Sequence, residues 1–346
     1  MKRITIRTVV LVGLISIPLS AQTEQERKEE ITVQTSGYMS FDFLKGQRQS
    51  SYHQGSAQDV RAGVTFSGRF AGSWDYALEA RFRSESEFSL EQAFLRLALS
   101  EKIRVRAGLF LVPFGVYNTS NRPYEQALAR VPLIVEEAYP RSWRDIGICV
   151  EGKFSFLDFA VYAGNGLGEG NRLKDGQQFR DRNADKGVGG RAGIRIDAFE
   201  FGYSLYRGKV DDRNRRKLIL QAGDASWKTN DFQILAEYIQ AWLDSPSPFG
   251  RAKCQGYHIQ AFFPFNPVSF AIGRQELTYK DPFRGPGFFA PDVAGLGIDE
   301  SRNRWALELL WPALPNLLVK AEYDFNREAG PKRSDDLFTA QVAFKF

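Results

Sequence analysis

The sequence predicts an all-β fold, a transmembrane antiparallel β-barrel of about 16 strands. Three observations predict it. From Ile31 onward, apolar and polar residues alternate with a period of two, which is the pattern of strands that have one apolar face. The connections between successive segments alternate between short and long, as in barrels with short periplasmic turns and longer outer loops. The chain ends on Phe346, with Phe344 and Val342 on the same face of the last segment.

Composition and segment length exclude other classes of protein. Hydrophobic residues make up 43% of the 346 residues and charged residues 25%, which excludes a chain that is disordered throughout. Beyond the N-terminus no apolar run reaches the roughly 18 residues of a membrane helix, so a polytopic helical membrane protein is excluded. A soluble β-sandwich shares the period of two. Most segments here reach about ten residues or more, which is longer than soluble strands usually are and favours the barrel.

Residues 1–21 have the composition of an export signal. Three basic residues lie within the first seven positions, the run from Val9 to Ile17 is apolar, and the small residue Ala21 ends the segment. We therefore expect cleavage after Ala21, and localisation in the outer membrane of a Gram-negative-type cell. Residues 22–30 form a charged leader, and we expect the barrel to span residues 31–346.

Sixteen alternating segments follow in order. Short turns follow the even-numbered segments and longer loops follow the odd-numbered ones, so both ends of the chain are expected on the periplasmic side. The two faces are least distinct in the fourth, eleventh and thirteenth segments. The expected strands are 31–44, 58–71, 73–84, 88–100, 102–111, 142–154, 156–164, 187–198, 199–208, 215–228, 231–243, 251–263, 267–278, 302–311, 317–327 and 336–346.

Three motifs lie between residues 90 and 170. Residues Gly108–Gly115 read GLFLVPFG, residues Arg144–Ile148 read RDIGI and precede Gly152, and residues Tyr162–Gly166 read YAGNG. These segments resemble the G-x-x-x-x-P-F-G segment and the two following strands of the phosphate-selective porin O and P family. The resemblance implies a sixteen-stranded, trimeric and passive channel. It also implies that phosphate-selective members line the pore with arginines and a few lysines.

The longest connection, residues 112–141, follows the fifth strand, where general porins fold a loop into the lumen. Its apolar content (Leu128, Val131, Leu133, Ile134 and Val135) favours the same inward fold here, and the alternative is a loop outside the barrel. An inward loop would narrow the pore. The residues that we expect at this constriction carry both signs of charge: Arg122, Tyr124, Arg130, Glu136, Glu137 and Arg141.

Arginines outnumber lysines 31 to 15 in this chain. Arginine stays charged and binds phosphate or carboxylate through two hydrogen bonds, so a wall of arginines would concentrate anions. The arginines that the alternation points into the lumen are Arg61, Arg69, Arg81, Arg83, Arg96, Arg104, Arg106, Arg191 and Arg195. The alternation also points eight carboxylates inward, and these would pair with the arginines across the wall: Asp75, Glu79, Glu91, Asp145, Glu151, Asp158, Glu308 and Glu322.

The function that these features predict is passive diffusion of small hydrophilic solutes, with a preference for phosphate or other oxyanions. A weakly selective general porin, a channel for one organic solute, and a closed structural or adhesive barrel are the alternatives. We expect no cofactor and no metal, because a chain with two His and two Cys has few ligands for one. We also expect no enzyme, since neither His53 nor His258 accompanies a motif such as G-x-S-x-G.

The expected partners follow from the outer membrane. They are small hydrophilic or anionic solutes, outer-membrane lipid and lipopolysaccharide, and two further copies of the chain in a homotrimer. The barrel assembly machinery would read Val342, Phe344 and Phe346. No basic run or stripe indicates nucleic acid. Cys149 and Cys254 are far apart in the sequence, and we expect both thiols to be free.

Overall fold

The computed structural model describes residues 31–84, 87–170, 172–244, 251–280, 301–328 and 333–346. The predicted signal segment and the whole charged leader therefore lie outside the described residues. The sixteen strands are β1 (Gln34–Gly46), β2 (Ser56–Ala71), β3 (Trp74–Arg83), β4 (Glu87–Ala98), β5 (Ile103–Leu111), β6 (Arg144–Lys153), β7 (Leu157–Gly164), β8 (Gly187–Ile196), β9 (Phe199–Lys209), β10 (Lys217–Lys228), β11 (Gln233–Asp244), β12 (Arg251–Phe263), β13 (Ser269–Lys280), β14 (Arg302–Leu314), β15 (Leu317–Glu328) and β16 (Leu337–Lys345).

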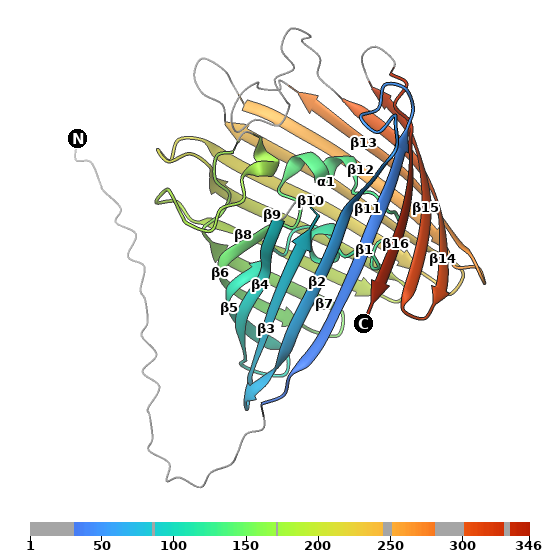
Figure 1. Ribbon diagram of the computed structural model, residues 1–346. Helices are drawn as coiled ribbons and strands as arrows, with labels where there is room; N and C mark the ends of the chain where they lie inside the picture. The colour runs from blue at the N-terminus through green and yellow to red at the C-terminus, as the bar shows by residue number, and fades with distance from the viewer. Residues whose placement is uncertain (1–30, 85–86, 171, 245–250, 281–300, 329–332) are drawn as a thin grey trace, which may run out of the picture.

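The strands form one closed antiparallel barrel (Figure 1). Each strand pairs with its neighbours in the chain, and β1 pairs with β16 to close the sheet, with Phe41 opposite Val342 and Met39 opposite Phe344. Every end of a strand lies within three residues of its expected position. The predicted fold class and strand number are confirmed.

The barrel buries charge and exposes apolar residues, which inverts the pattern of a soluble protein. On β14, Glu308 is 2% exposed, whereas Leu307 and Leu309 on either side of it are each 46% exposed. Neighbouring side chains of a strand point to opposite faces, so the charged residues lie inside the barrel and the apolar ones outside. An outer surface of this kind suits a hydrocarbon surrounding.

A β-bulge in β4 explains why its two faces were indistinct in the sequence. Glu79 pairs with Gln92 and the next residue, Ala80, pairs with Leu90, so Glu91 has no partner of its own on β3. A bulge adds one residue to a strand and shifts the alternation beyond it. Glu91 and Gln92 consequently both point inward, where Glu91 contacts Arg81 and Gln92 donates to Glu79.

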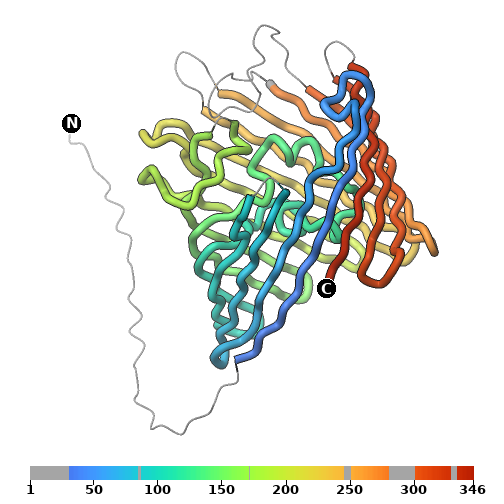
Figure 2. Tube along the Cα trace, viewed as in Figure 1, coloured from blue at the N-terminus to red at the C-terminus, as the bar shows by residue number. Residues whose placement is uncertain are grey.

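The two ends of the barrel differ (Figure 1, Figure 2). Short turns join β2 to β3, β4 to β5 and the later even strands to their successors, and β1 begins and β16 ends on this side. The longer connections lie at the other end. The connection from β5 to β6 carries the 3-10 helix η1 (Tyr117–Thr119) and the helix α1 (Leu133–Ala138), and the connection from β7 to β8 carries η2 (Leu173–Asp175). Among the described residues, no helix has the length and apolarity that crossing a membrane would require.

Candidate functional site

The connection between β5 and β6 folds into the barrel, and we call residues 112–143 the inner loop. The apolar residues that favoured an inward fold are all buried: Leu128, Val131, Leu133, Ile134 and Val135. Helix α1 packs against the inner faces of β12 and β13. The expectation of an inward loop is confirmed. The loop replaces water in this part of the lumen by a packed apolar core.

Four aromatic rings anchor the two ends of the inner loop to the wall. Trp143 is fully buried, and its ring centroid lies 5.5 Å from Phe114, 5.7 Å from Tyr139 and 4.8 Å from Tyr206 on β9. Phe114 is the phenylalanine of the G-x-x-x-x-P-F-G-like segment, Gly108–Gly115. Aromatic pairs in such tilted and edge-to-face arrangements stabilise beyond the area they bury. The rings therefore hold the point where the chain leaves β5 close to the point where it enters β6.

Polar side chains of the wall bind the backbone of the inner loop. Ser204 Oγ on β9 accepts from Gly115 N–H at 3.0 Å, and Glu237 Oε1 on β11 accepts from Val116 N–H at 3.0 Å. Further along the loop, Gln275 Oε1 on β13 accepts from Leu133 N–H at 3.0 Å. Buried N–H groups need such partners because no water reaches them. The wall thus supplies the hydrogen bonds that the irregular loop cannot make within itself.

A further attachment is at β14 and β15. Lys320 is 1% exposed, and its Nζ donates to the carbonyl oxygens of Pro123 at 2.8 Å, Gln126 at 2.7 Å and Leu128 at 3.4 Å. Next to it, the N–H of Ala129 donates to Glu308 at 2.9 Å and to Glu322 at 2.7 Å. One ammonium and two carboxyl groups therefore hold seven consecutive residues of the loop, 123–129, to the wall.

The expected constriction residues lie in the inner loop, most of them in ion pairs with the wall. Arg122 Nη2 lies 2.8 Å from Glu79 Oε2, and Arg130 Nη1 lies 3.3 Å from Asp324 Oδ2. Arg141 Nη2 lies 3.9 Å from Asp59 Oδ2. These pairs tie the loop to β3, β15 and the outer end of β2.

Three further constriction candidates contact other elements. Tyr124 packs edge-on against Tyr38 with ring centroids 5.9 Å apart. Glu137 is 5% exposed and pairs with Lys174 at 3.1 Å and Arg302 at 3.2 Å, so it lies within packed protein. Glu136 remains partly exposed, with Arg130 at 3.8 Å. Burial would raise the pKa of Glu136, but Arg130, Arg304 and further guanidinium groups outweigh burial and lower it below its usual range.

Seven of the nine arginines expected to line the pore have carboxylate partners within 4.0 Å. Pairing of the inward arginines with carboxylates across the wall was the alternative that the sequence left open. Arg191 lies 2.6 Å from Asp224, and Arg96 lies 2.8 Å from Asp75. The other pairs are Arg61 with Asp42, Arg81 with Glu91, Arg83 with Asp59, Arg106 with Glu151, and Arg195 with Glu200. Pairing of this kind reduces the attraction that each arginine exerts on a passing anion.

Some of these pairs depend on tertiary details. Arg191 on β8 reaches Asp224 on β10 across the intervening β9, where Gly202 lies between them. A Cβ at position 202 would lie 2.2 Å from Arg191 Nη2, so with any larger residue there the two side chains would have to shift. Arg81 is 6% exposed and donates to Ser142 at 2.6 Å and to Asn121 at 3.1 Å, which makes it part of the loop's attachment.

Arg69 and Arg104 differ from the other seven. Both are exposed, and neither forms an ion pair with any residue that the structure describes. Arg104 lines a cavity of about 390 Å³ on the short-turn side of the inner loop, and we call it the basic cavity. Its charged lining comprises Lys102, Arg104, Arg106, Lys153 and Arg191 against Glu101, Glu151 and Asp158. Positive charge is in excess there.

Arg106 in the basic cavity is held by rings. Its guanidinium carbon lies 5.6 Å from the centroid of Phe94 and 4.9 Å from that of Phe110. Cation–π contacts keep the group in place without neutralising it. Its nearest carboxylate oxygen, on Glu151, is 3.7 Å from Nε, longer than a hydrogen bond.

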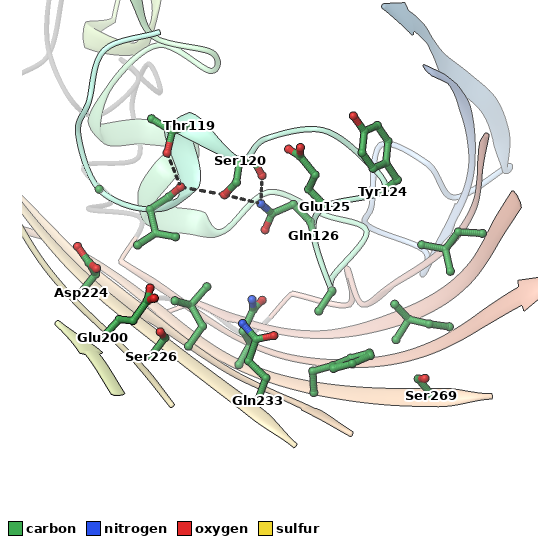
Figure 3. A pocket seen from close by; sticks show the side chains of 18 of the residues that line it. Thr119, Ser120, Tyr124, Glu125, Gln126, Glu200, Asp224, Ser226, Gln233 and Ser269 are labelled. Atoms are coloured by element: carbon green, nitrogen blue, oxygen red, sulfur yellow. Dashed lines mark hydrogen bonds between the residues drawn. The ribbon is translucent and has the colours of Figure 1, made fainter. Parts of the chain in front are cut away.

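Two further cavities adjoin the inner loop. The outer cavity, about 360 Å³ at the long-loop end, is lined by Arg130, Arg302, Arg304, Arg327 and Arg333, with Glu328 and Asp335, among other residues. The turn-side cavity, about 590 Å³, lies between the loop and the inner faces of β7 to β15 (Figure 3). The described parts of the lumen therefore hold open space on both sides of the loop.

Each of the two histidines contacts a neighbouring oxygen atom of the protein. His258 on β12 is 2% exposed, and its Nε2 lies 2.9 Å from Oε2 of Glu237, whose other oxygen accepts from Val116 N–H. His53 lies in the outer connection after β1, next to the carbonyl of Ser50. Within the described ranges, no group of three or more His, Cys, Asp or Glu is arranged to hold a metal ion. Cys149 and Cys254 are both free and buried, as expected.

Sequence reasoning did not identify the residues that attach the loop. The alternation in β9 and β15 places Ser204 and Lys320 inward, and that signal was available. Glu237 and Gln275 lie on β11 and β13, where the sequence left the two faces indistinct. Their partners are backbone groups of the loop, which no sequence pattern specifies.

Comparisons with known proteins show the fold. No family model matches this chain. An uncharacterized protein of Aquifex aeolicus is 27% identical over 81 residues, which are 23% of this chain and 19% of that protein. Among solved structures, the barrel is similar to the anion-selective porin from Comamonas acidovorans, with TM-score 0.65, 12% identity, and 91% and 99% of the two chains covered. It is also similar to Salmonella typhi OmpF in complex with daunomycin, with TM-score 0.64, 15% identity, and 91% and 97% covered. The trimer form of OmpT, an outer membrane protein of Vibrio cholerae, has TM-score 0.63, 11% identity, and 91% and 99% covered. None of these comparisons singles out the phosphate-selective family.

Proposed function

We propose that this protein is a passive outer-membrane channel for small hydrophilic solutes. The observation that carries the proposal is the inverted burial of the wall: charge lines the inside, apolar residues cover the outside, and cavities remain on both sides of an inward loop. A barrel of this size encloses an aqueous lumen unless something fills it. The porin structures of the same fold support this proposal.

The finer part of the proposal is a modest preference for anions. It rests on the excess of arginine at two places, the basic cavity and the outer cavity, which lie on opposite sides of the inner loop. Local potentials of one sign raise the concentration of the opposite ion in a narrow passage. The other arginines are paired with carboxylates, which reduces their attraction for anions and favours a weak anion preference over tight binding of phosphate. Weak binding also suits a channel, because a bound solute must be able to leave.

Single-channel recording in a planar bilayer tests both parts. Discrete steps in current support the channel, and a reversal potential shifted toward the anion in a salt gradient supports the preference. Absence of current steps would instead indicate the alternative of a closed structural or adhesive barrel. Addition of phosphate then distinguishes a weakly anion-preferring pore from a phosphate-selective one. Block of the current by phosphate at low concentration would indicate the phosphate-selective pore.

Arg104→Gln is the variant that tests the basic cavity. Arg104 has no ion-pair partner among the described residues, so neutralising it removes positive charge without disturbing the wall. We expect the reversal potential to move toward the value for a non-selective pore. Arg207→Gln is the matched control, because Arg207 lies exposed on the outward face of β9. Equal reversal potentials in the wild type and in Arg104→Gln would contradict the role of this arginine.

The remaining elements of the proposal concern export and assembly. We infer cleavage of residues 1–21, recognition of Val342, Phe344 and Phe346 by the barrel assembly machinery, and a homotrimer in contact with lipid and lipopolysaccharide. In support, Phe344 and Phe346 are exposed on the outer face of the barrel, and the trimer form of the Vibrio cholerae protein has the same fold. Mass measurement of the native protein in detergent tests both the cleavage site and the trimer.

A further inference from the structure

The turn-side cavity differs from the two cavities that carry excess arginine. All of its lining residues belong to the described part of the chain, and its volume of about 590 Å³ falls within the roughly 300–1,000 Å³ of small-molecule sites. It lies directly below the inner loop, so a solute that crosses the lumen passes it (Figure 3). What this cavity would bind follows from three sections of its wall.

The arginines of the charged section are paired with carboxylates of the same section. Arg191 lies 2.6 Å from Asp224 and 3.4 Å from Asp158, and Arg195 is paired with Glu200. Paired charges of this kind are already satisfied, and an ionic solute would have to compete with them. Four carboxylates and two arginines line the cavity in total, so no excess of positive charge is present to attract an anion: Asp158, Glu200, Asp224, Glu125, Arg191 and Arg195.

The uncharged polar section has hydrogen-bonding capacity to spare. The side chains of Ser226, Gln233 and Gln260 make no hydrogen bond to any other residue that the structure describes. Each glutamine amide offers two donors and an acceptor, and a hydroxyl offers both. Across the cavity lie Thr119, Ser120 and Gln126 of the inner loop, whose side chains donate to carbonyl oxygens within the loop (Figure 3).

Strand register interleaves these amides with apolar side chains. Gln233 is directly opposite Phe262, and Leu235 is directly opposite Gln260, on the adjacent strands β11 and β12. All four side chains line the cavity. Opposite residues on one face lie about 4.5–5.5 Å apart, so the four form a square with amides on one diagonal and apolar groups on the other.

We propose that this square is a subsite for neutral polyhydroxylated solutes of the size of one or two sugar rings. A sugar ring presents hydroxyl groups, which both donate and accept, around an apolar C–H face. The two amides match the hydroxyls, and Phe262 with Leu235 matches the C–H face. The inference rests on the proposed channel, because the solute reaches the cavity through the lumen.

The first test is block of the single-channel current by maltose, with polyethylene glycol of equal size as the probe that lacks the array of hydroxyls. Maltose reduces the current saturably and polyethylene glycol reduces it only in proportion to its size. Gln233→Ala/Gln260→Ala raises the half-blocking maltose concentration about tenfold, as expected for the loss of two hydrogen-bonding groups. Gln221→Ala/Gln255→Ala is the matched control, because both glutamines lie on the outward face of β10 and β12, and it leaves the block unchanged.

Equal effects of maltose and polyethylene glycol that the double variant does not alter would overturn the subsite and leave the channel standing. If the barrel gives no current steps, the channel proposal fails, and titration calorimetry of the folded protein in detergent still decides the subsite. Heat of maltose binding that is lost in Gln233→Ala/Gln260→Ala and in Phe262→Ala supports it. Absence of binding heat in the wild type overturns it.

Discussion

Replacing Lys320 by methionine should release part of the inner loop from the wall. Methionine keeps the length and apolar stem of the side chain but removes the ammonium group that donates to the carbonyls of Pro123, Gln126 and Leu128. It also leaves Glu308 and Glu322 next to a neutral side chain. The perturbation therefore acts on the loop segment 123–129, while the strand pairing of β15 stays intact.

The magnitude follows from the three hydrogen bonds. A hydrogen bond to a charged group contributes about 1.5–3 kcal/mol, and burying an ammonium costs several kcal/mol that the variant no longer has to meet. Removing one partner from a buried charged cluster typically costs about 3–5 kcal/mol. We take about 3 kcal/mol as the loss of docking free energy, which corresponds to roughly a 150-fold fall in the ratio of docked to released loop.

Limited trypsin digestion of the folded protein measures this ratio. Arg130 directly follows the attached segment, and its bond to Val131 becomes cleavable when the segment is released, whereas the Arg122–Pro123 bond resists trypsin. When the loop opens and closes faster than it is cut, the cleavage rate follows the population of the open form, so we expect cleavage to accelerate by about two orders of magnitude. Single-channel current should become noisier as well. Lys228→Met, at an exposed position at the end of β10, is the control. Equal cleavage rates in Lys320→Met and the wild type would refute the reasoning.

Three further predictions follow from the inner loop and the buried wall. Trp143→Ala, which empties a fully buried ring site, should lower the free energy of unfolding by about 3–5 kcal/mol, measured by thermal unfolding in detergent, and Trp227→Ala on the outer face should cost less. The pKa of Glu136 is lowered, so its pairing with Arg130 stabilises the loop fully at pH values above the ordinary carboxyl pKa of about 4.3. This stabilisation is lost as the pH falls through the lowered pKa. Glu136→Gln should therefore be more trypsin-sensitive than the wild type at pH 7, and pepsin sensitivity in strong acid should be equal; a difference that persists in acid would argue against the pair. Cys149 and Cys254 should resist maleimide in the folded barrel and react after unfolding, and labelling of the folded protein would show that these strands are not packed as described.

The sequence determined the wall of the barrel. Strand positions, the inward and outward faces and the inward course of the loop all followed from alternation and apolar content, because a strand places successive residues on opposite faces whatever its neighbours are. The bulge at Glu91 marks the limit of this reasoning. One extra residue shifts the alternation, and nothing in the residues from Ser89 to Gln92 shows where the partner strand skips a position.

The tertiary structure decided which charges remain available and how the lumen is divided. Arg191 and Asp224 are inward by alternation, but their contact passes over Gly202 of the strand between them, where a larger side chain would displace them. Lys320 was visible as an inward charge, yet its partners are backbone carbonyls almost 200 residues earlier in the chain. The reason is physical: alternation is a property of one strand, whereas ion pairs, loop attachments and cavities depend on the register of several strands and on the path of a loop that has no repeating pattern.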